Sequence, residues 1–300
     1  MALSKQFLKK WVRLFLYNTF GRLGFRTGMK SDILILTSSR SGSTWLVESI
    51  LVNDKCKLIN QPFDCLFNNN VYENLLPILN QNHHFVNLTN IEEEQVIRFW
   101  NRLRKGSLNP NSTWKIFSKF FNFFYERKLF KVFFLKEKVQ FFENEDNLVV
   151  LYLIRNPLHT SLSNINYNYK PSGESLIKFK SLSEYPNEFS ELKQIYFSST
   201  NILVKYIISW CFENYKPFVK ANSSNNIILI RYEDLKDRKE SILSYISQTL
   251  NIQFSPNYMK SQTFKKSNTS FNKEPMYKLK EDINYPFISK AVNKYFEYKI

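Results

Sequence analysis

Residues 35–46 (ILTSSRSGSTWL) have the composition and spacing of a loop that holds a phosphate group. They run from an apolar stretch through a small polar turn into residues typical of a helix start. On the phosphate-loop pattern G-x-x-x-x-G-K-[ST], Gly42 falls on the second glycine and Thr44 on the final hydroxyl residue. Thr37 replaces the first glycine, and Ser43 replaces the lysine. The retained glycine predicts a backbone that turns closely around an anion.

The side chains of this loop favour a phosphate over a nucleoside triphosphate. The backbone N–H groups of residues 41–44 and the start of the following helix can bind an anion, and Arg40 adds a cation. Without a lysine at position 43, the loop lacks the side chain that contacts the β- and γ-phosphates of a triphosphate. The alternative interpretation is a serine-rich turn between a strand and a helix that binds nothing.

A second group suited to phosphate binding follows the apolar run 148–154. Arg155 comes at the carboxyl end of this predicted strand, which is where open α/β sheets bind ligands. Asn156 can cap the next helix, and Pro157 suits its first turn. Ser163 lies about two turns into that helix, so the arginine and a hydroxyl together predict a phosphate clamp. The alternative is an ordinary strand exit with a solvated serine.

Three segments resemble the PAPS-dependent sulfotransferases, which use 3′-phosphoadenosine 5′-phosphosulfate (PAPS) as the sulfate donor. Residues 40–46 (RSGSTWL) are similar to the family's 5′-phosphosulfate loop, [KR]-S-G-[ST]-[ST]-W/F-L. Residues 155–163 resemble its 3′-phosphate motif, R-[DN]-P with a serine eight residues after the arginine. Residues 228–235 (ILIRYEDL) resemble its strand ending in R-Y-E-D-L. The resemblance spans roughly residues 32–240.

The resemblance implies an enzyme that transfers a sulfuryl group from PAPS, releases PAP and needs no metal. Arg40 would be catalytic, because it stabilises the leaving phosphate. A late basic, hydroxyl-rich loop at residues 263–270 would fold over the 3′-phosphate, although a solvated tail explains it equally well. The third motif is structural, with Arg231 and Glu233 bracing the sheet end. The implied donor-binding residues are Ser39, Arg40, Ser41, Gly42, Ser43, Thr44, Trp45, Arg155, Ser163, Lys265 and Lys266.

The candidate for the general base is Asp64. Residues 59–64 (INQPFD) loosely resemble the E-P-x-[E] region of bacterial trehalose-type and related carbohydrate sulfotransferases, and Asp64 falls on its second acidic position. The acceptor implied is therefore a hydroxyl of a carbohydrate or glycolipid. Gln61 stands where the family has glutamate, which leaves open a catalytically silent relative. Asp64 could instead cap a helix, and His83 and His84 are rival bases.

The alternation of apolar runs with helical stretches predicts an α/β fold. We expect a three-layer sandwich with a mostly parallel central sheet, the P-loop-like sulfotransferase fold. The domain division predicted is a basic amphipathic N-terminal helix over residues 1–30 and one sulfotransferase-like domain over residues 31–300. The expected strands are 33–36, 113–117 (with Lys115), 148–154 and 227–230, and the expected helices are 44–52, 91–105, 126–138, 157–166 and 189–219.

Residues 1–30 combine a helical stripe of apolar side chains with basic residues. Phe7, Trp11 and Leu14 lie on the stripe, and Arg13 interrupts any apolar run that a secretory signal would need. One interpretation is a helix on an anionic membrane surface. The other, which we favour, is a helix packed on the domain. The expected location is the cytoplasm, with peripheral contact at the cytosolic membrane face as the alternative.

The composition of the 300 residues limits the classes of partner. A total of 42 Lys and Arg against 26 Asp and Glu gives a formal net charge of +16, which predicts an anionic partner. The three cysteines form no C-x-x-C pair, which favours a reducing compartment and no zinc site. The rival functions are a nucleotide kinase or hydrolase with an altered loop, and a non-catalytic basic protein that binds membrane or nucleic acid. The basic residues are spread along the chain, so we expect no nucleic-acid partner.

Overall fold

The computed structural model describes residues 24–63, 88–107, 122, 124–254 and 274–300. Five parallel strands form the central sheet in the order β3-β5-β2-β6-β7. Strand β2 lies at the centre of the sheet. Both of its edges are therefore paired, and all six of its residues are buried. The strands are β2 (Asp32–Thr37), β3 (Cys56–Asn60), β5 (Arg127–Val132), β6 (Leu148–Ile154) and β7 (Ile227–Arg231).

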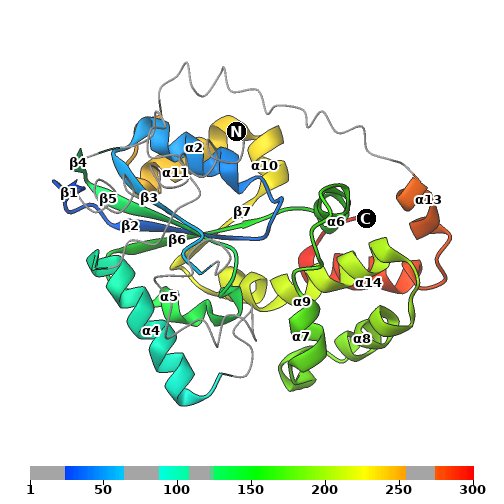
Figure 1. Ribbon diagram of the computed structural model, residues 1–300. Coiled ribbons are helices and arrows are strands. Elements are labelled where there is room, and N and C mark those ends of the chain that lie inside the picture. Colours follow the sequence, from blue (N-terminus) through cyan, green and yellow to red (C-terminus); the bar gives the residue numbers. More distant parts are fainter. Residues whose placement is uncertain (1–23, 64–87, 108–121, 123, 255–273) are drawn as a thin grey trace, which may run out of the picture.

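Helices cover both faces of this sheet, so the molecule has three layers as predicted (Figure 1). On one face lie α2 (Ser43–Asn53), α10 (Tyr232–Asp237) and α11 (Lys239–Leu250). On the other lie α4 (Asn90–Lys105), α5 (Gln140–Glu143) and α9 (Ile202–Ser223). The remaining elements are α6 (Pro157–Asn166), α7 (Glu174–Phe179), α8 (Glu188–Ser198), α13 (Glu274–Lys280), α14 (Tyr285–Phe296), the 3₁₀ turns η2 (Lys136–Lys138) and η3 (Leu182–Glu184), and a small pair of strands, β1 (Phe25–Arg26) and β4 (Phe124–Tyr125).

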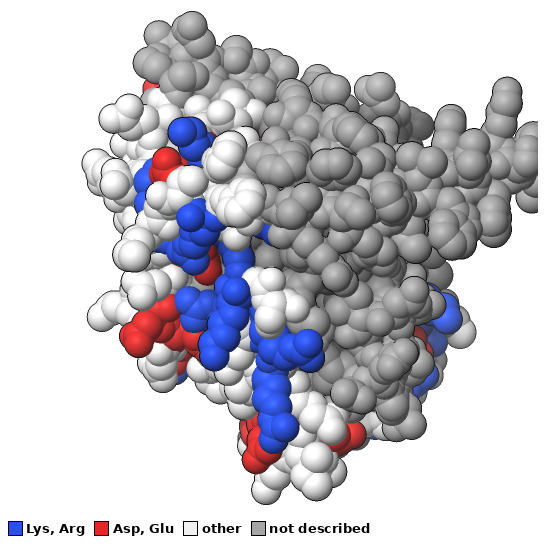
Figure 2. All heavy atoms as spheres, turned by 60° about the vertical axis from the view of Figure 1, so that its left-hand side comes forward, with Lys and Arg blue, Asp and Glu red and all other residues white. Residues whose placement is uncertain are grey.

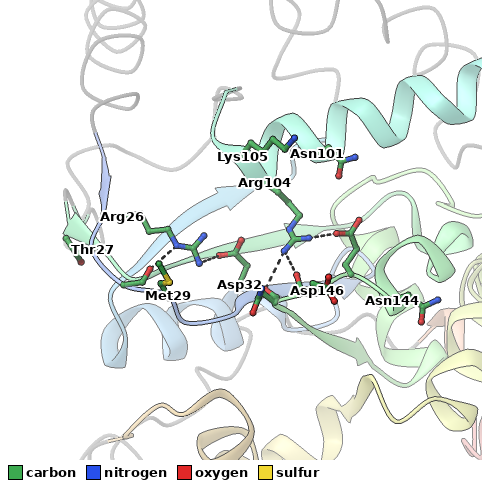
Figure 3. A pocket seen from close by; sticks show the side chains of 12 residues that line it. Arg26, Thr27, Met29, Asp32, Asn101, Arg104, Lys105, Asn144 and Asp146 are labelled. Atoms are coloured by element: carbon green, nitrogen blue, oxygen red, sulfur yellow. Dashed lines mark hydrogen bonds and ion pairs between the residues drawn. The ribbon is translucent and has the colours of Figure 1, made fainter.

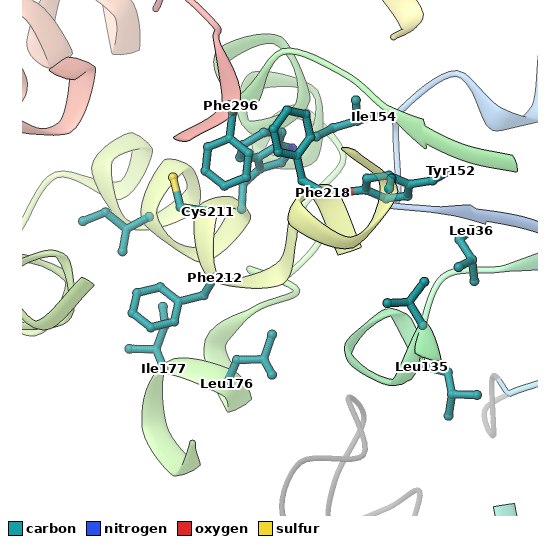
Figure 4. Packing of buried hydrophobic residues seen from close by; sticks show 14 of the residues in the cluster. Leu36, Leu135, Tyr152, Ile154, Leu176, Ile177, Cys211, Phe212, Phe218 and Phe296 are labelled. Atoms are coloured by element: carbon teal, nitrogen blue, oxygen red, sulfur yellow. The ribbon is translucent and has the colours of Figure 1, made fainter. Parts of the chain in front are cut away.

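The core divides in two because side chains alternate across each strand. Ile33 and Ile35 of β2 pack with α2 and α11 on one face. Leu34 and Leu36 pack on the other face in a larger cluster that extends to α4, α9 and α14. Figure 4 shows part of this larger cluster, in which Tyr152 of β6 lies beside residues of α9. Both faces of the sheet are therefore apolar, which explains the continuous apolar runs in the sequence.

The helix predicted over residues 126–138 is wrong. This segment forms strand β5 followed by turn η2. The first two charged side chains of the strand have partners at its amino end. Arg127 forms a buried ion pair with Asp54, and Lys128 donates to the carbonyl of Leu103 at the end of α4. Leu129 and Phe130 between them fill the core.

The single long helix predicted over residues 189–219 is two helices, α8 and α9. The helix is interrupted between them because polar side chains accept hydrogen bonds from backbone N–H groups at the start of α9. The Asn201 side chain accepts hydrogen bonds from the N–H groups of Leu203 and Val204, and Ser199 accepts from the N–H of Asn201. This is an N-cap inside an otherwise helical pattern.

Other sequence predictions fall partly or wholly outside the described residues. The strand over 113–117 lies outside them, as do residues 1–23 of the predicted N-terminal helix. The described part of that prediction, residues 24–30, contains strand β1 and no helix. Among the described residues, Cys56 and Cys211 are buried free thiols, and Cys65 lies outside this part of the chain. Within the described ranges, the search for a helix of sufficient length and hydropathy to cross a membrane found none.

Candidate functional site

The predicted phosphate loop joins the central strand to the first helix of the sheet. Strand β2 ends at Thr37 and α2 begins at Ser43, with Gly42 as its N-cap in the left-handed conformation at φ 87°. Ser41 closes the turn, because its Oγ donates to the carbonyl of Ser38 at 2.6 Å. The first N–H groups of α2 have no acceptor within the helix, so they and the positive end of its dipole are available to an anion.

Arg40 lies in this loop with its guanidinium held at two places. Its Nε donates a hydrogen bond to Ser163 Oγ at 3.0 Å, and its Cζ lies 3.9 Å from the centroid of the Tyr167 ring. Its two terminal nitrogens form no hydrogen bond with any other described residue. The structure thus brings Arg40 and Ser163 together across 123 positions of sequence, because α6 follows the strand beside β2.

Arg155 reaches the same loop from the neighbouring strand β6. Its Nη1 donates to the carbonyl of Arg40 at 2.8 Å, and its Cζ lies 4.7 Å from the centroid of the Tyr232 ring. Burial lowers the pKa of its guanidinium. Its Nε is buried and has no hydrogen-bond partner among the described residues. Asn156 caps α6 as predicted, accepting from the N–H of Leu158 at 3.0 Å.

Neither Arg40 nor Arg155 forms an ion pair with any carboxylate of the described residues. Three other arginines that are partly or fully buried are paired: Arg104 with Glu145, Arg127 with Asp54 and Arg231 with Glu297. A desolvated cation without an anion is unfavourable, so two of them side by side at a phosphate-type loop favour an anionic ligand.

Sequence reasoning missed a third cation at this loop, Lys131. It lies at the carboxyl end of β5, is 4% exposed, and places its Nζ 3.4 Å from Thr44 Oγ1. Burial lowers its pKa to about 8. The signal was hidden because residues 126–138 had been assigned to a helix. Lys115, in the strand predicted over residues 113–117, lies outside the described residues.

The lowered pKa of Lys131 predicts that anion binding weakens in alkali. Its amine is protonated below about pH 8 and neutral above it. The affinity for PAP is therefore expected to fall about tenfold between about pH 7 and about pH 9.5, the worth of one charged hydrogen bond. Isothermal titration calorimetry over this range measures the fall, and Lys131→Met should bind weakly with a flat profile.

Lys128 provides a matched control for this pH dependence. Burial lowers its pKa to about 8 as well, but its Nζ bonds to the carbonyl of Leu103 at the opposite end of the same strand. Lys128→Met is expected to keep the alkaline fall in PAP affinity. If Lys131→Met keeps the wild-type slope, Lys131 is not the titrating group.

The remaining predicted site residues differ in their exposure, and some lie outside the described part of the chain. Ser41 and Ser43 are buried, whereas Thr44 is exposed at the start of α2. Ser39 and Trp45 flank the loop and are half-buried. Among the described residues there is no cluster of three metal-ligating side chains. Asp64, His83, His84, Lys265 and Lys266 lie outside the described residues, so their predicted roles stay predictions.

The third motif braces the structure at the end of β7. Arg231 Nη1 donates to the carbonyl of Phe296 at 3.1 Å, and Nη2 pairs with Glu297. Glu233 accepts from the N–H of Asn156 at 3.0 Å and from the hydroxyl of Tyr298 at 3.1 Å. These bonds tie the end of β6 to the C-terminal segment, as sequence reasoning expected.

A pocket at the opposite end of the sheet is a poorer anion site. It lies beside the start of β2 and the end of α4, has a volume of about 1010 Å³, and contains Arg26 and Arg104 (Figure 3). Lys and Arg side chains gather on this side of the molecule (Figure 2). However, Arg26 pairs with Asp32 at 3.3 Å and Arg104 pairs with Glu145. Both guanidinium groups are thus already neutralised.

The fold is an α/β sandwich with a phosphate-type loop after its central strand. Two arginines there have no carboxylate partner among the described residues, which favours an anionic ligand. Comparison with known families makes the class definite. The family model of the sulfotransferase domain matches residues 30–296, so the chain belongs to the sulfotransferase family and is a transferase. No curated protein matches the chain.

Two solved structures are similar to this chain at low identity. The sulfotransferase domain of the olefin synthase from Synechococcus PCC 7002 is 13% identical with a TM-score of 0.40, and the match covers 92% of this chain and 90% of that one. The sulfotransferase domain of the curacin biosynthetic pathway is 14% identical with a TM-score of 0.38, covering 89% of this chain and 99% of that one.

Proposed function

We propose that this sulfotransferase takes its sulfuryl group from PAPS and passes it to a hydroxyl of a carbohydrate or glycolipid, releasing PAP. The observation that supports the donor is the pair Arg40 and Arg155. The Arg155 guanidinium donates to the main-chain carbonyl of Arg40 at 2.8 Å, and neither arginine has a carboxylate partner among the described residues. PAPS carries anionic groups at both ends of one ribose, and two adjacent cations suit such a ligand.

Each group around the loop has a defined part in this proposal. Arg155 and Ser163 bind the 3′-phosphate, and the buried, unpartnered Nε of Arg155 is available to one of its oxygens. Arg40 and the N–H groups of residues 42–44 bind the 5′-phosphate, whereas the N–H of Ser41 donates to the carbonyl of Ser38. Lys131 adds a charge beside the Thr44 hydroxyl.

The reaction proposed is an in-line displacement at sulfur. The bond between sulfur and the 5′-phosphate oxygen breaks, the bond between sulfur and the acceptor oxygen forms, and the acceptor proton passes to a base. Negative charge grows on the leaving phosphate oxygen, where Arg40 and the loop amides stabilise it. The protein therefore acts mainly by positioning the reactants and by electrostatic stabilisation.

Asp64 is the proposed base, and the acceptor proposal rests on the same segment. Strand β3 ends at Asn60, at the same edge of the sheet as the phosphate loop. The N–H of Gln61 then donates to the carbonyl of Lys131 at 2.7 Å. Residues 61–63 thus leave the sheet beside a lysine of the proposed site, which supports Asp64 as a group near the acceptor.

The cytoplasmic location and the membrane contact are proposals from the sequence. The N-terminal helix would make the contact, and the described residues next to it support an apolar surface there. Phe25 and Phe124 are 60% and 61% exposed, and their ring centroids lie 6.1 Å apart. Exposed aromatic rings beside basic residues suit a membrane interface. The described residues offer no comparable support for a nucleic-acid partner.

A donor-binding and transfer experiment tests the function. Calorimetric titration with PAP and with ATP is expected to show PAP binding at least about tenfold more tightly, because Ser43 replaces the lysine that triphosphates need. Incubation with ³⁵S-labelled PAPS and a panel of glycans and glycolipids is then expected to label a hydroxyl-bearing acceptor. Asp64→Asn should bind PAP normally and transfer sulfate at least about 100-fold more slowly.

Each arm of this experiment has a result that contradicts one part of the proposal. Tighter binding of ATP than of PAP would favour the kinase or hydrolase alternative. PAP binding without transfer to any acceptor would favour the catalytically silent relative. Normal transfer by Asp64→Asn would remove the base assignment and leave the donor assignment standing, and labelling of a non-carbohydrate acceptor alone would remove the acceptor assignment.

A further inference from the structure

A lysine and a glutamate are buried together directly behind the phosphate loop. The side chains of Lys136 and Glu213 are 1% and 3% exposed, and Lys136 Nζ lies 2.5 Å from Glu213 Oε1. Lys136 comes from the turn after β5, and Glu213 from the middle of α9. Removing two charges from water is unfavourable, and apolar residues of similar size usually stabilise a fold as well. Stability alone is therefore a weak explanation for this pair.

The ammonium group of Lys136 is bound to the phosphate loop itself. Its Nζ donates to Ser38 Oγ at 2.5 Å, and Ser38 Oγ in turn donates to Asn214 Oδ1 at 3.1 Å. The Tyr152 hydroxyl of β6 donates to the same Asn214 oxygen at 2.9 Å. Ser38, 4% exposed, is thus held by side chains from η2 and α9, and Tyr152 of β6 bonds to the same Asn214.

The position of Ser38 determines the turn that contains Arg40. The carbonyl of Ser38 accepts from Ser41 Oγ at 2.6 Å and from Ser41 N at 3.4 Å, which closes the turn. Within it, Arg40 has φ 65°, a left-handed conformation that is unfavourable for a residue with a side chain. Such a conformation persists where the surrounding contacts fix it, and functional loops are where it is commonly found.

A second contact of Glu213 explains why a charged pair suits this place. Glu213 Oε2 accepts from the Ser172 hydroxyl, and Oε1 holds Lys136. The three N–H bonds of the ammonium are used by Glu213 Oε1, Ser38 Oγ and Asn214 Oδ1, the last at 3.4 Å. A fully bonded ammonium has one orientation, whereas an apolar side chain would leave Ser38 Oγ with its bond to Asn214 Oδ1 and no donor from Lys136.

We propose that Lys136, fixed by Glu213, is a positioning residue of the transferase. It sets the phosphate-loop geometry through Ser38, so that the Arg40 guanidinium and the loop amides are aimed at the leaving phosphate. It touches neither the donor nor the acceptor. This inference rests on the proposed function, because it concerns the orientation of the proposed donor site.

The test separates the position of the loop from the stability of the fold. A single change, Lys136→Met, leaves Glu213 buried and unpaired, so loss of folding is its expected result. The double variant Lys136→Met with Glu213→Leu removes both charges and should fold. Ser38→Ala keeps the ion pair and removes only the link, and its melting temperature should stay near that of the wild type.

Both variants are expected to lose the same function. We expect Ser38→Ala and the double variant each to lower kcat about tenfold or more and to weaken PAP binding by less, because a misaimed Arg40 affects the transition state most. A merely structural role would change the melting temperature without this split between kcat and PAP affinity. The triple variant combines Ser38→Ala with Lys136→Met and Glu213→Leu. Its kcat should be no lower than that of the double variant, because all three changes break one shared link.

Ser199→Ala is the matched control, because Ser199 is also a buried serine and accepts the N–H of Asn201 at the start of α9. It should change neither kcat nor PAP affinity. Wild-type kcat in Ser38→Ala and in the double variant, or losses that simply add in the triple variant, would overturn the positioning role and leave the proposed function standing. If the wild-type protein binds no PAP and transfers no sulfate from PAPS, the proposed function and this inference both fail.

Discussion

Arg155→Ala is expected to weaken the binding of PAP by about 30-fold to about 1,000-fold, or about 2–4 kcal/mol. The change removes a buried guanidinium that has no carboxylate partner among the described residues and whose Nε is without a hydrogen bond there. Calorimetric titration of the purified variant with PAP measures the loss. Arg155→Lys should recover only part of the affinity, because an ammonium lacks the planar fork that binds two phosphate oxygens.

The same variant should cost the ligand-free protein little stability. It loses the hydrogen bond to the carbonyl of Arg40 and the contact with the Tyr232 ring. It also relieves a charge whose pKa is already lowered by burial. These effects oppose one another, so the free energy of unfolding is expected to change by less than about 1 kcal/mol.

Arg231→Ala provides the comparison at the neighbouring strand. Arg231 pairs with Ile154, the residue before Arg155, in the register of β6 and β7, but its guanidinium is neutralised by Glu297. We expect it to lower the melting temperature and to leave PAP affinity unchanged. Equal losses of PAP affinity in the two variants would show a general effect of the sheet end, and the assignment of Arg155 to the donor would fail.

The sequence alone predicts those parts of the site that depend on residues close together in the chain. The apolar runs of β2 and β6, the glycine at position 42 and the Asn-Pro pair after Arg155 each determine a short stretch of backbone. Those short-range rules located the turn between β2 and α2 and the start of α6 correctly. They contain no information on which strands are neighbours.

The contacts between separate segments of the site depend on the order of the strands in the sheet. Arg40 meets Ser163 because β2 and β6 are adjacent, and Lys131 meets Thr44 because β5 lies on the other side of β2. The helix predicted over residues 126–138 is wrong because β5 pairs with β2 and β3, which are distant in sequence. The charges of this segment also have distant partners: Arg127 of β5 pairs with Asp54, and Lys136 of η2 pairs with Glu213. A single sequence does not reveal such pairs.

Gly42→Ala is expected to disrupt both folding and donor binding. A Cβ at this position would lie 2.2 Å from Cε2 of Tyr232, and the backbone there has φ 87°. The ring cannot retreat without losing its place beside Arg155, whose Cζ lies 4.7 Å from the ring centroid. We expect a loss of about 2–4 kcal/mol in the free energy of unfolding, measured by urea denaturation. Binding of PAP should fall below detection in the fraction that folds.

Gly106→Ala separates the steric contact from the backbone strain. Gly106 ends α4 with φ 81°, nearly the value at Gly42, but the nearest atom to its Cβ would be Lys128 Nζ at 3.2 Å, a contact that a shift of a few tenths of an ångström relieves. This variant should lose only about 1 kcal/mol, the usual cost of alanine in a left-handed position, and should bind PAP normally. If the two variants lose the same stability and Gly42→Ala still binds PAP, the close packing of Tyr232 against the loop has no part in forming the site. The predicted difference between them follows from the size of the overlap, because a Cβ 2.2 Å from the Tyr232 ring requires a large displacement and one 3.2 Å from Lys128 Nζ requires a small one.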